Sequence, residues 1–69
     1  MVTISEISQH KYDTDDCVFF RNALQSTLYM LNGATLLDVI PLATERRMLF
    51  VFSRADHERL KDKWNNHEL

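Results

Sequence analysis

The chain contains only one cysteine and one glycine among its 69 residues, and it has no surplus of positive charge. The single cysteine, Cys17, excludes an intramolecular disulfide, and no spacing of cysteine and histidine resembles a structural zinc site. No glycine-rich loop that would bind phosphate is present. Eight basic and ten acidic residues give a net charge of -2, which provides no general attraction to nucleic acids or anionic membranes.

Long hydrophobic runs are absent as well. No segment approaches the ~20 apolar residues that span a bilayer, and residues 1–10 lack the basic leader and apolar core of a signal peptide. We therefore expect a cytoplasmic protein with no membrane partner. Hydrophobic residues make up 45% of the chain and charged residues 26%, a balance typical of a folded globular domain.

The small size of the chain predicts an oligomer. A chain of 69 residues forms one domain, and a core of that size supplies only about 3–5 kcal/mol of stability. Disulfides, metals or partner chains usually supplement such a core. Because the sequence offers neither a disulfide nor a metal site, we expect a homodimer.

A first helix is predicted over residues 14–32. Residues 13–16 supply the side-chain acceptors and negative charge that favour a helix N-terminus. Apolar residues then recur at spacings of three and four and define one helix face: Cys17, Phe20, Leu24, Leu28 and Leu31. Gly33 is expected to end the helix in a left-handed conformation.

The apolar surface of this predicted helix is wider than one small sheet requires. Phe19 and Met30 broaden the main apolar face and Tyr29 lies further round the helix, and we predict all three as candidate dimer-interface residues. Surplus apolar surface on a small domain usually marks a contact site. A second copy of the chain is the default partner for that site, and another protein is the alternative.

Two apolar runs, residues 36–40 and 48–52, predict an antiparallel hairpin joined by residues 41–47. In the second strand Met48, Phe50 and Phe52 point to one face, while Leu49 and Val51 point to the other. Both faces are therefore apolar, and helices can cover only one of them. We expect dimerisation to complete or cover the sheet, either by edge pairing of two hairpins or by stacking of two sheet faces.

A second helix is predicted from Ser53, which begins a capping box with Asp56, to about Asn65. Leu60 and Trp64 lie four residues apart and anchor it. The expected fold is α+β, with residues 1–12 as an N-terminal arm or short edge strand and residues 13–69 as one α-β-β-α domain. The residues expected in its core are Phe20, Leu24, Leu28, Leu36, Val39, Phe50, Phe52, Leu60 and Trp64.

The chain resembles a family of small bacterial and phage domains of unknown function over residues 11–66. The residues that carry the resemblance are Thr14, Asp16, Gly33, residues 36–39 (Leu-Leu-Asp-Val), residues 50–52 (Phe-Val-Phe), Leu60 and Trp64. The resemblance implies a Gly-stopped helix, a Phe-Val-Phe strand, a C-terminal helix and a mobile genetic element as the setting. It brings no catalytic residues.

No group of residues predicts catalysis, a cofactor or a metal. Cys17 near a helix start could be activated as a nucleophile with His10 as its base, but Asp15 and Asp16 oppose a second negative charge there. The small Cys17 side chain also fits the apolar face. The three histidines are scattered along the chain, and a chain of this length offers little concave surface for paired carboxylates. We therefore predict a protein that is not an enzyme.

The alternative function is nucleic-acid binding through a basic strip around the hairpin turn and the second helix. The residues of this strip are Arg46, Arg47, Arg54, Arg59, Lys61 and Lys63. Acidic residues are interleaved with them, a pattern more typical of a solvated charged face. The first prediction is therefore a homodimeric protein-interaction module, with nucleic acid as the second candidate partner.

Overall fold

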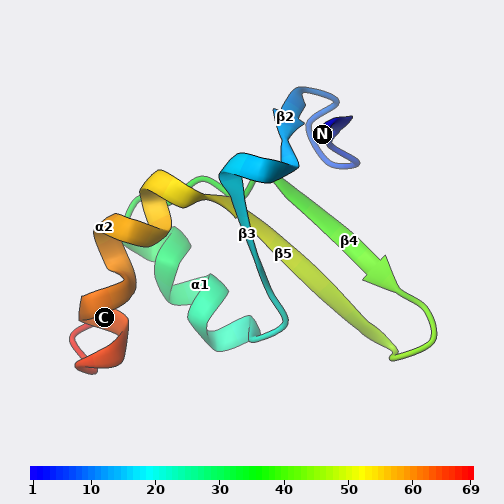
Figure 1. The fold of residues 1–69 in the computed structure, drawn as a ribbon. Helices are drawn as coiled ribbons and strands as arrows, with labels where there is room; N and C mark the ends of the chain where they lie inside the picture. The colour runs from blue at the N-terminus through cyan, green and yellow to red at the C-terminus, as the bar shows by residue number, and fades with distance from the viewer.

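Two antiparallel sheets and two α-helices build the structure, a computed structural model that describes residues 1–69 (Figure 1). In chain order the elements are β1 (Val2–Ile4), β2 (Lys11–Asp13), the 3-10 helix η1 (Thr14–Asp16), β3 (Cys17–Phe20), α1 (Ala23–Leu31), β4 (Asp38–Leu42), β5 (Arg47–Ser53) and α2 (Arg54–Asn65). The smaller sheet pairs β1 with β2, and the larger sheet has the strand order β3-β5-β4. The predicted hairpin is confirmed as β4 and β5.

The predicted α+β class is confirmed, but the α-β-β-α order is not, because three strands precede the first α-helix. The prediction of one helix over residues 14–32 is wrong for residues 17–20, which form the strand β3 between η1 and α1. Val18, Phe19 and Phe20 are β-branched or aromatic residues, which favour a strand. They pair with β5, with Phe19 opposite Val51, and this pairing outweighs the helical spacing of the apolar residues.

Local capping residues set the ends of both α-helices. The side chain of Asn22 begins α1 by accepting a hydrogen bond from an amide of the first turn (3.1 Å), and Gly33 ends it with φ at 94°, as predicted. Ser53 begins α2, also as predicted, because its Oγ accepts the Asp56 amide (3.1 Å). The Asp56 carboxylate does not return to the cap and instead accepts the Thr35 amide (3.1 Å).

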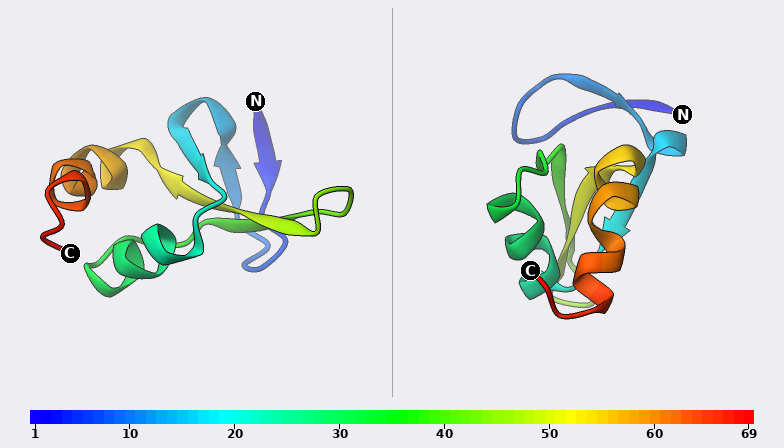
Figure 2. Two further views of the ribbon diagram at one scale, coloured as in Figure 1. Left: turned by 90° about the horizontal axis from the view of Figure 1, so that it is seen from below. Right: turned by 90° about the vertical axis from the view of Figure 1, so that its left-hand side faces the viewer.

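The two helices lie side by side on one face of the larger sheet, and the core lies between them and the sheet (Figure 2). Its buried cluster contains Tyr29 from α1, Ala34, Phe52 from β5 and Leu60 from α2. Half-buried apolar residues surround the cluster: Val18, Phe20, Leu36, Phe50, Trp64 and Leu69. Only nine of the 69 residues are buried, so the core of one chain is small.

The N-terminal residues fold as a hairpin, β1 and β2, at the end of the larger sheet where β4 begins (Figure 1). This hairpin does not extend the larger sheet, and the boundary predicted after residue 12 falls inside β2. The termini of the chain lie at opposite ends of the molecule (Figure 1). Neither α-helix is long and apolar enough to cross a membrane.

Candidate interaction surface

The two helices differ sharply in charge. Seven of the twelve residues of α2 are charged: Arg54, Asp56, Glu58, Arg59, Lys61, Asp62 and Lys63. In contrast, α1 contains no charged residue, and neither does the whole segment of residues 22–37. A helix that faces water usually carries charges on its outer side, as α2 does. The outer side of α1 is therefore the unusual surface of this protein.

The outer side of α1 is lined by leucines. Ser26 and Tyr29 form its fully buried side, whereas Leu24 is 61% exposed and Leu31 is 76% exposed. Leu28 lies between these two leucines on the same side and is half-buried. We refer to Leu24, Leu28 and Leu31, spaced by four and three residues, as the leucine stripe.

The core position predicted for Leu24 is therefore wrong, and Leu28 is only half-buried. The prediction rested on a helix that included residues 17 and 20, but both of these belong to β3. The shorter α1 instead directs Tyr29 inward, because its hydroxyl group finds a hydrogen-bond partner on α2. No local signal distinguishes these two orientations of α1.

The structure also separates the predicted interface residues. Tyr29 is completely buried within one chain and offers no surface to a partner. Met30 is 38% exposed and lies about 100° round the helix axis from Leu31. Phe19 is 41% exposed, but it alternates with core-facing Val18 and Phe20 and so points to the opposite face of the sheet. Met30 is therefore the one predicted residue that is exposed on α1.

A pair of Tyr29, which is fully buried, and His57, which is half-buried, joins α1 to α2. The Tyr29 hydroxyl and His57 Nδ1 lie 2.9 Å apart, and the ring of Phe20 lies 5.3 Å from both aromatic rings. Burial lowers the pKa of His57, and the nearby Glu58 offsets part of this effect. The neutral imidazole can accept the hydroxyl hydrogen of Tyr29, which holds α1 with its leucine stripe outward.

Acidification is expected to destabilise the protein through His57. Because burial lowers the pKa of His57 below its ordinary value of 6.5, the unfolded chain binds more protons as the pH falls through that value. The contribution of the pair is therefore complete above pH 6.5 and decreases below it. Urea unfolding from neutral pH to about pH 5 is expected to show this loss in the wild type. The variant H57Q should show a flatter profile, with H67Q as the control; equal slopes in H57Q and wild type would contradict the expectation.

A second polar cluster centres on Asp38, the first residue of β4, which is buried. Its carboxylate accepts hydrogen bonds from the Tyr12 hydroxyl (2.6 Å), the Ser5 hydroxyl (3.4 Å) and the amides of Glu6 (2.8 Å) and Val39 (2.9 Å). Burial alone would raise the pKa of Asp38, but these donors outweigh it and lower the pKa below its ordinary value. Asp38 therefore anchors the N-terminal hairpin to the larger sheet as a carboxylate.

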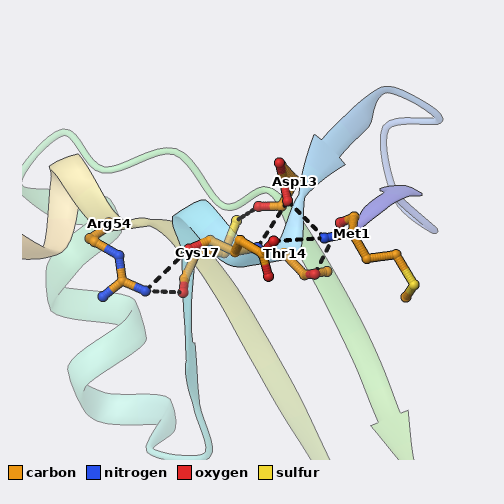
Figure 3. A network of polar contacts seen from close by, with 6 residues as sticks. Met1, Asp13, Thr14, Cys17 and Arg54 are labelled. Atoms are coloured by element: carbon orange, nitrogen blue, oxygen red, sulfur yellow. Dashed lines mark hydrogen bonds and ion pairs between the residues drawn. The ribbon is translucent and has the colours of Figure 1, made fainter.

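Cys17 lies in a network of structural contacts where η1 meets β3 (Figure 3). Its Sγ lies 3.2 Å from the Asp13 carbonyl oxygen, and the guanidinium of Arg54 donates to the carbonyls of Asp15 (3.3 Å) and Cys17 (3.4 Å). Burial raises the pKa of Cys17, and Asp16 adds to the effect, so the thiol form is favoured. The contacts support the packing role that was expected for this cysteine.

The basic residues do not form one strip within a single chain. Arg46 and Arg47 lie at the tip of the β4–β5 hairpin, at the opposite end of the sheet from α2 (Figure 2). In and beside α2, Arg54 donates to backbone carbonyls, Arg59 to the Asn32 carbonyl (3.2 Å), and Lys61 pairs with Glu58 (2.7 Å). Lys63 lies two residues beyond Lys61 in α2 and forms no ion pair.

Arg21, which was not part of the predicted strip, joins the residues at the hairpin tip. Its Nε lies 3.2 Å from Glu45 Oε2. Sequence spacing could not reveal this neighbour, because Arg21 follows β3 and is 24 residues from Glu45. No three histidine, cysteine, aspartate or glutamate side chains are grouped so as to hold a metal ion.

Comparisons of the chain with protein-family models, with curated proteins and with solved structures gave no match.

Proposed function

We propose that this protein is a non-enzymatic protein-interaction module that forms a homodimer through the leucine stripe of α1. The observation that carries the proposal is the outward direction of Leu24, Leu28 and Leu31 on a helix without charge. Exposed apolar surface of this regularity is typical of a contact site. The proposal includes the cytoplasm as the compartment and a mobile genetic element as the setting.

A second copy of the chain is the partner that this surface fits. In a two-fold dimer the same surface of each copy meets itself, and an uncharged helix does so without repulsion between like charges. The exposed surface of the two stripes would be removed from water, and complete burial of an exposed leucine contributes about 1.5–3 kcal/mol, a figure that applies to Leu24 and Leu31 rather than to half-buried Leu28. This burial supplements a core that holds only nine buried residues per chain.

The edge of β4 is poorly suited to the alternative of edge pairing. The Val39 amide donates to Asp38 Oδ1 (2.9 Å) and is therefore not free to pair with another strand. Pro41, two residues further along, would direct its amide to the same side of β4, but proline has no amide hydrogen. A strand edge with few free donors resists pairing with another chain. The helix surface is therefore a better candidate than the β4 edge for the dimer contact.

The variant L24E/L31E is expected to abolish dimerisation. Each chain then carries two carboxylates within the contact, and the dimer loses four buried leucines, which raises its dissociation constant by about a hundredfold or more. Light scattering after size exclusion over a wide range of concentration measures this change. K63E lowers the net charge by the same two units on α2 and should remain dimeric. A wild type that is monomeric throughout, or a dimeric L24E/L31E, would refute the proposal.

A third variant, L24E/L31K, reports the direction of the helices and keeps the net charge at -2. Glutamate near the N-terminus and lysine near the C-terminus of α1 both favour the helix, so folding should be retained. In an antiparallel contact the new glutamate faces the partner's new lysine, and some association persists. In a parallel contact like charges face each other, and the chains separate.

A further inference from the structure

The β4–β5 hairpin projects beyond the rest of the larger sheet. β5 pairs with β4 from residue 47, but with β3 only from residue 50, so three residues of β5 extend past β3, roughly 10 Å at the rise of a strand. The projecting end is visible in Figure 2 as the loop furthest from both helices. It carries Arg46 and Arg47 at its turn.

The tip is locally positive in a chain whose net charge is negative. Between Asp38 and Asp56 the only acidic residue is Glu45, and its partner is Arg21. This ion pair is exposed on both sides, so it contributes little and leaves Arg21 available to a stronger partner. Arg46 and Arg47 form no ion pair with any carboxylate, unlike Arg59 and Lys61 of α2.

The three arginines surround a shallow hollow of about 350 Å³ with an apolar floor. Its lining residues are Arg21, Ala23, Arg46, Arg47, Met48 and Phe50. Guanidinium groups bind phosphates through paired hydrogen bonds, and apolar side chains beside them can contact an unpaired base. Met48 is 46% exposed although it lies in a strand, so this floor is open to a ligand.

We propose that Arg21, Arg46 and Arg47 bind the phosphate backbone of single-stranded nucleic acid. An open, projecting site suits an extended strand, whose successive phosphates can reach successive arginines. The site lies within one chain, and Leu24 and Leu31 are not among its lining residues. A monomeric L24E/L31E therefore retains it, and failure of the dimer proposal can be distinguished from failure of this one.

Fluorescence anisotropy of a labelled single-stranded oligonucleotide tests the site. Three phosphate contacts predict that the affinity of the wild type falls about 20-fold between 50 and 200 mM salt. The variant R46Q/R47Q has one contact left, so it should bind more weakly, and its affinity should fall only about threefold over the same range of salt. K11Q/K63Q removes the same charge at exposed lysines without ion pairs and should keep the wild-type salt dependence. R46K/R47K should bind more weakly than the wild type, since lysine cannot form the paired hydrogen bonds.

Four results would overturn the proposal. The first is that the wild type does not bind the oligonucleotide at the lower salt concentration, and the second is that R46Q/R47Q and K11Q/K63Q lose affinity equally. The third is that a duplex of the same length binds as tightly as the single strand. The fourth is that polyglutamate displaces the labelled oligonucleotide as effectively as unlabelled oligonucleotide does. Thermal unfolding of each variant verifies that it is folded, and the exposure of the substituted side chains predicts little change in stability.

Discussion

Replacing Asp38 by alanine is expected to lower the free energy of unfolding by about 3 kcal/mol, most of what a domain of this size possesses. The substitution leaves the partly buried amide of Glu6 and the hydroxyl groups of Tyr12 and Ser5 without their acceptor. Unpaired donors in a buried site each cost about 1–3 kcal/mol, although part of the hairpin can open to water. The N-terminal hairpin should separate from the sheet first.

Urea unfolding and hydrogen exchange together measure this effect. Amides of β1 and β2 should exchange faster in D38A than in the wild type, because Asp38 anchors this hairpin. D38N keeps one acceptor oxygen and should lose less stability than D38A. D62A removes an exposed carboxylate from α2 and is expected to change stability by less than about 0.5 kcal/mol. Unchanged exchange of β1 and β2 in a destabilised D38A would contradict the anchoring role.

The second large effect is expected for F52A, at a cost of about 3–5 kcal/mol. Phe52 is fully buried, and its ring lies 5.8 Å from those of Phe20 and Tyr29, so alanine leaves a cavity where α1, β3 and β5 meet. A loss of this size equals the whole stability of a small domain, and F52A should be largely unfolded at room temperature. Circular dichroism and urea unfolding measure the loss.

A matched control for F52A lies in the same sheet. F19A removes the same ring from an exposed position on the opposite face and should cost far less, about 1 kcal/mol. F52L keeps most of the volume, and an intermediate loss would show that cavity size sets the cost even if F52A cannot be folded. Equal effects of F52A and F19A would mean that Phe52 does not belong to the core as described.

Much of the fold could be predicted from the sequence because several of its signals are local. Gly33 ends α1 and Ser53 begins α2 through contacts within one turn, and the apolar runs of residues 36–40 and 48–52 predict the hairpin, although β4 starts two residues later than expected. Such signals need no knowledge of distant residues. The α+β class follows from them.

The rest depends on residues that are distant in sequence. β3 forms because it pairs with β5, and a segment of four apolar residues reads equally well as helix or strand without that partner. The orientation of α1 depends on Tyr29 meeting His57, 28 residues away. The sequence carries one signal for the polar cluster: Asp38 is a single charge within an apolar run, a pattern that indicates a buried, hydrogen-bonded carboxylate. The sequence of α1 contains no comparable signal for which side of the helix is buried.

The position of β3 in the sheet has a consequence for synthesis of the chain. Its partners in β5 lie 30 to 36 residues later, from Phe20 with Phe50 to Cys17 with Ser53. During translation, Val18, Phe19 and Phe20 therefore leave the ribosome before the strand that pairs with them has emerged. The sheet can close only when residue 53 has emerged, so the apolar segment of residues 17–20 is open to chaperones and to aggregation until then.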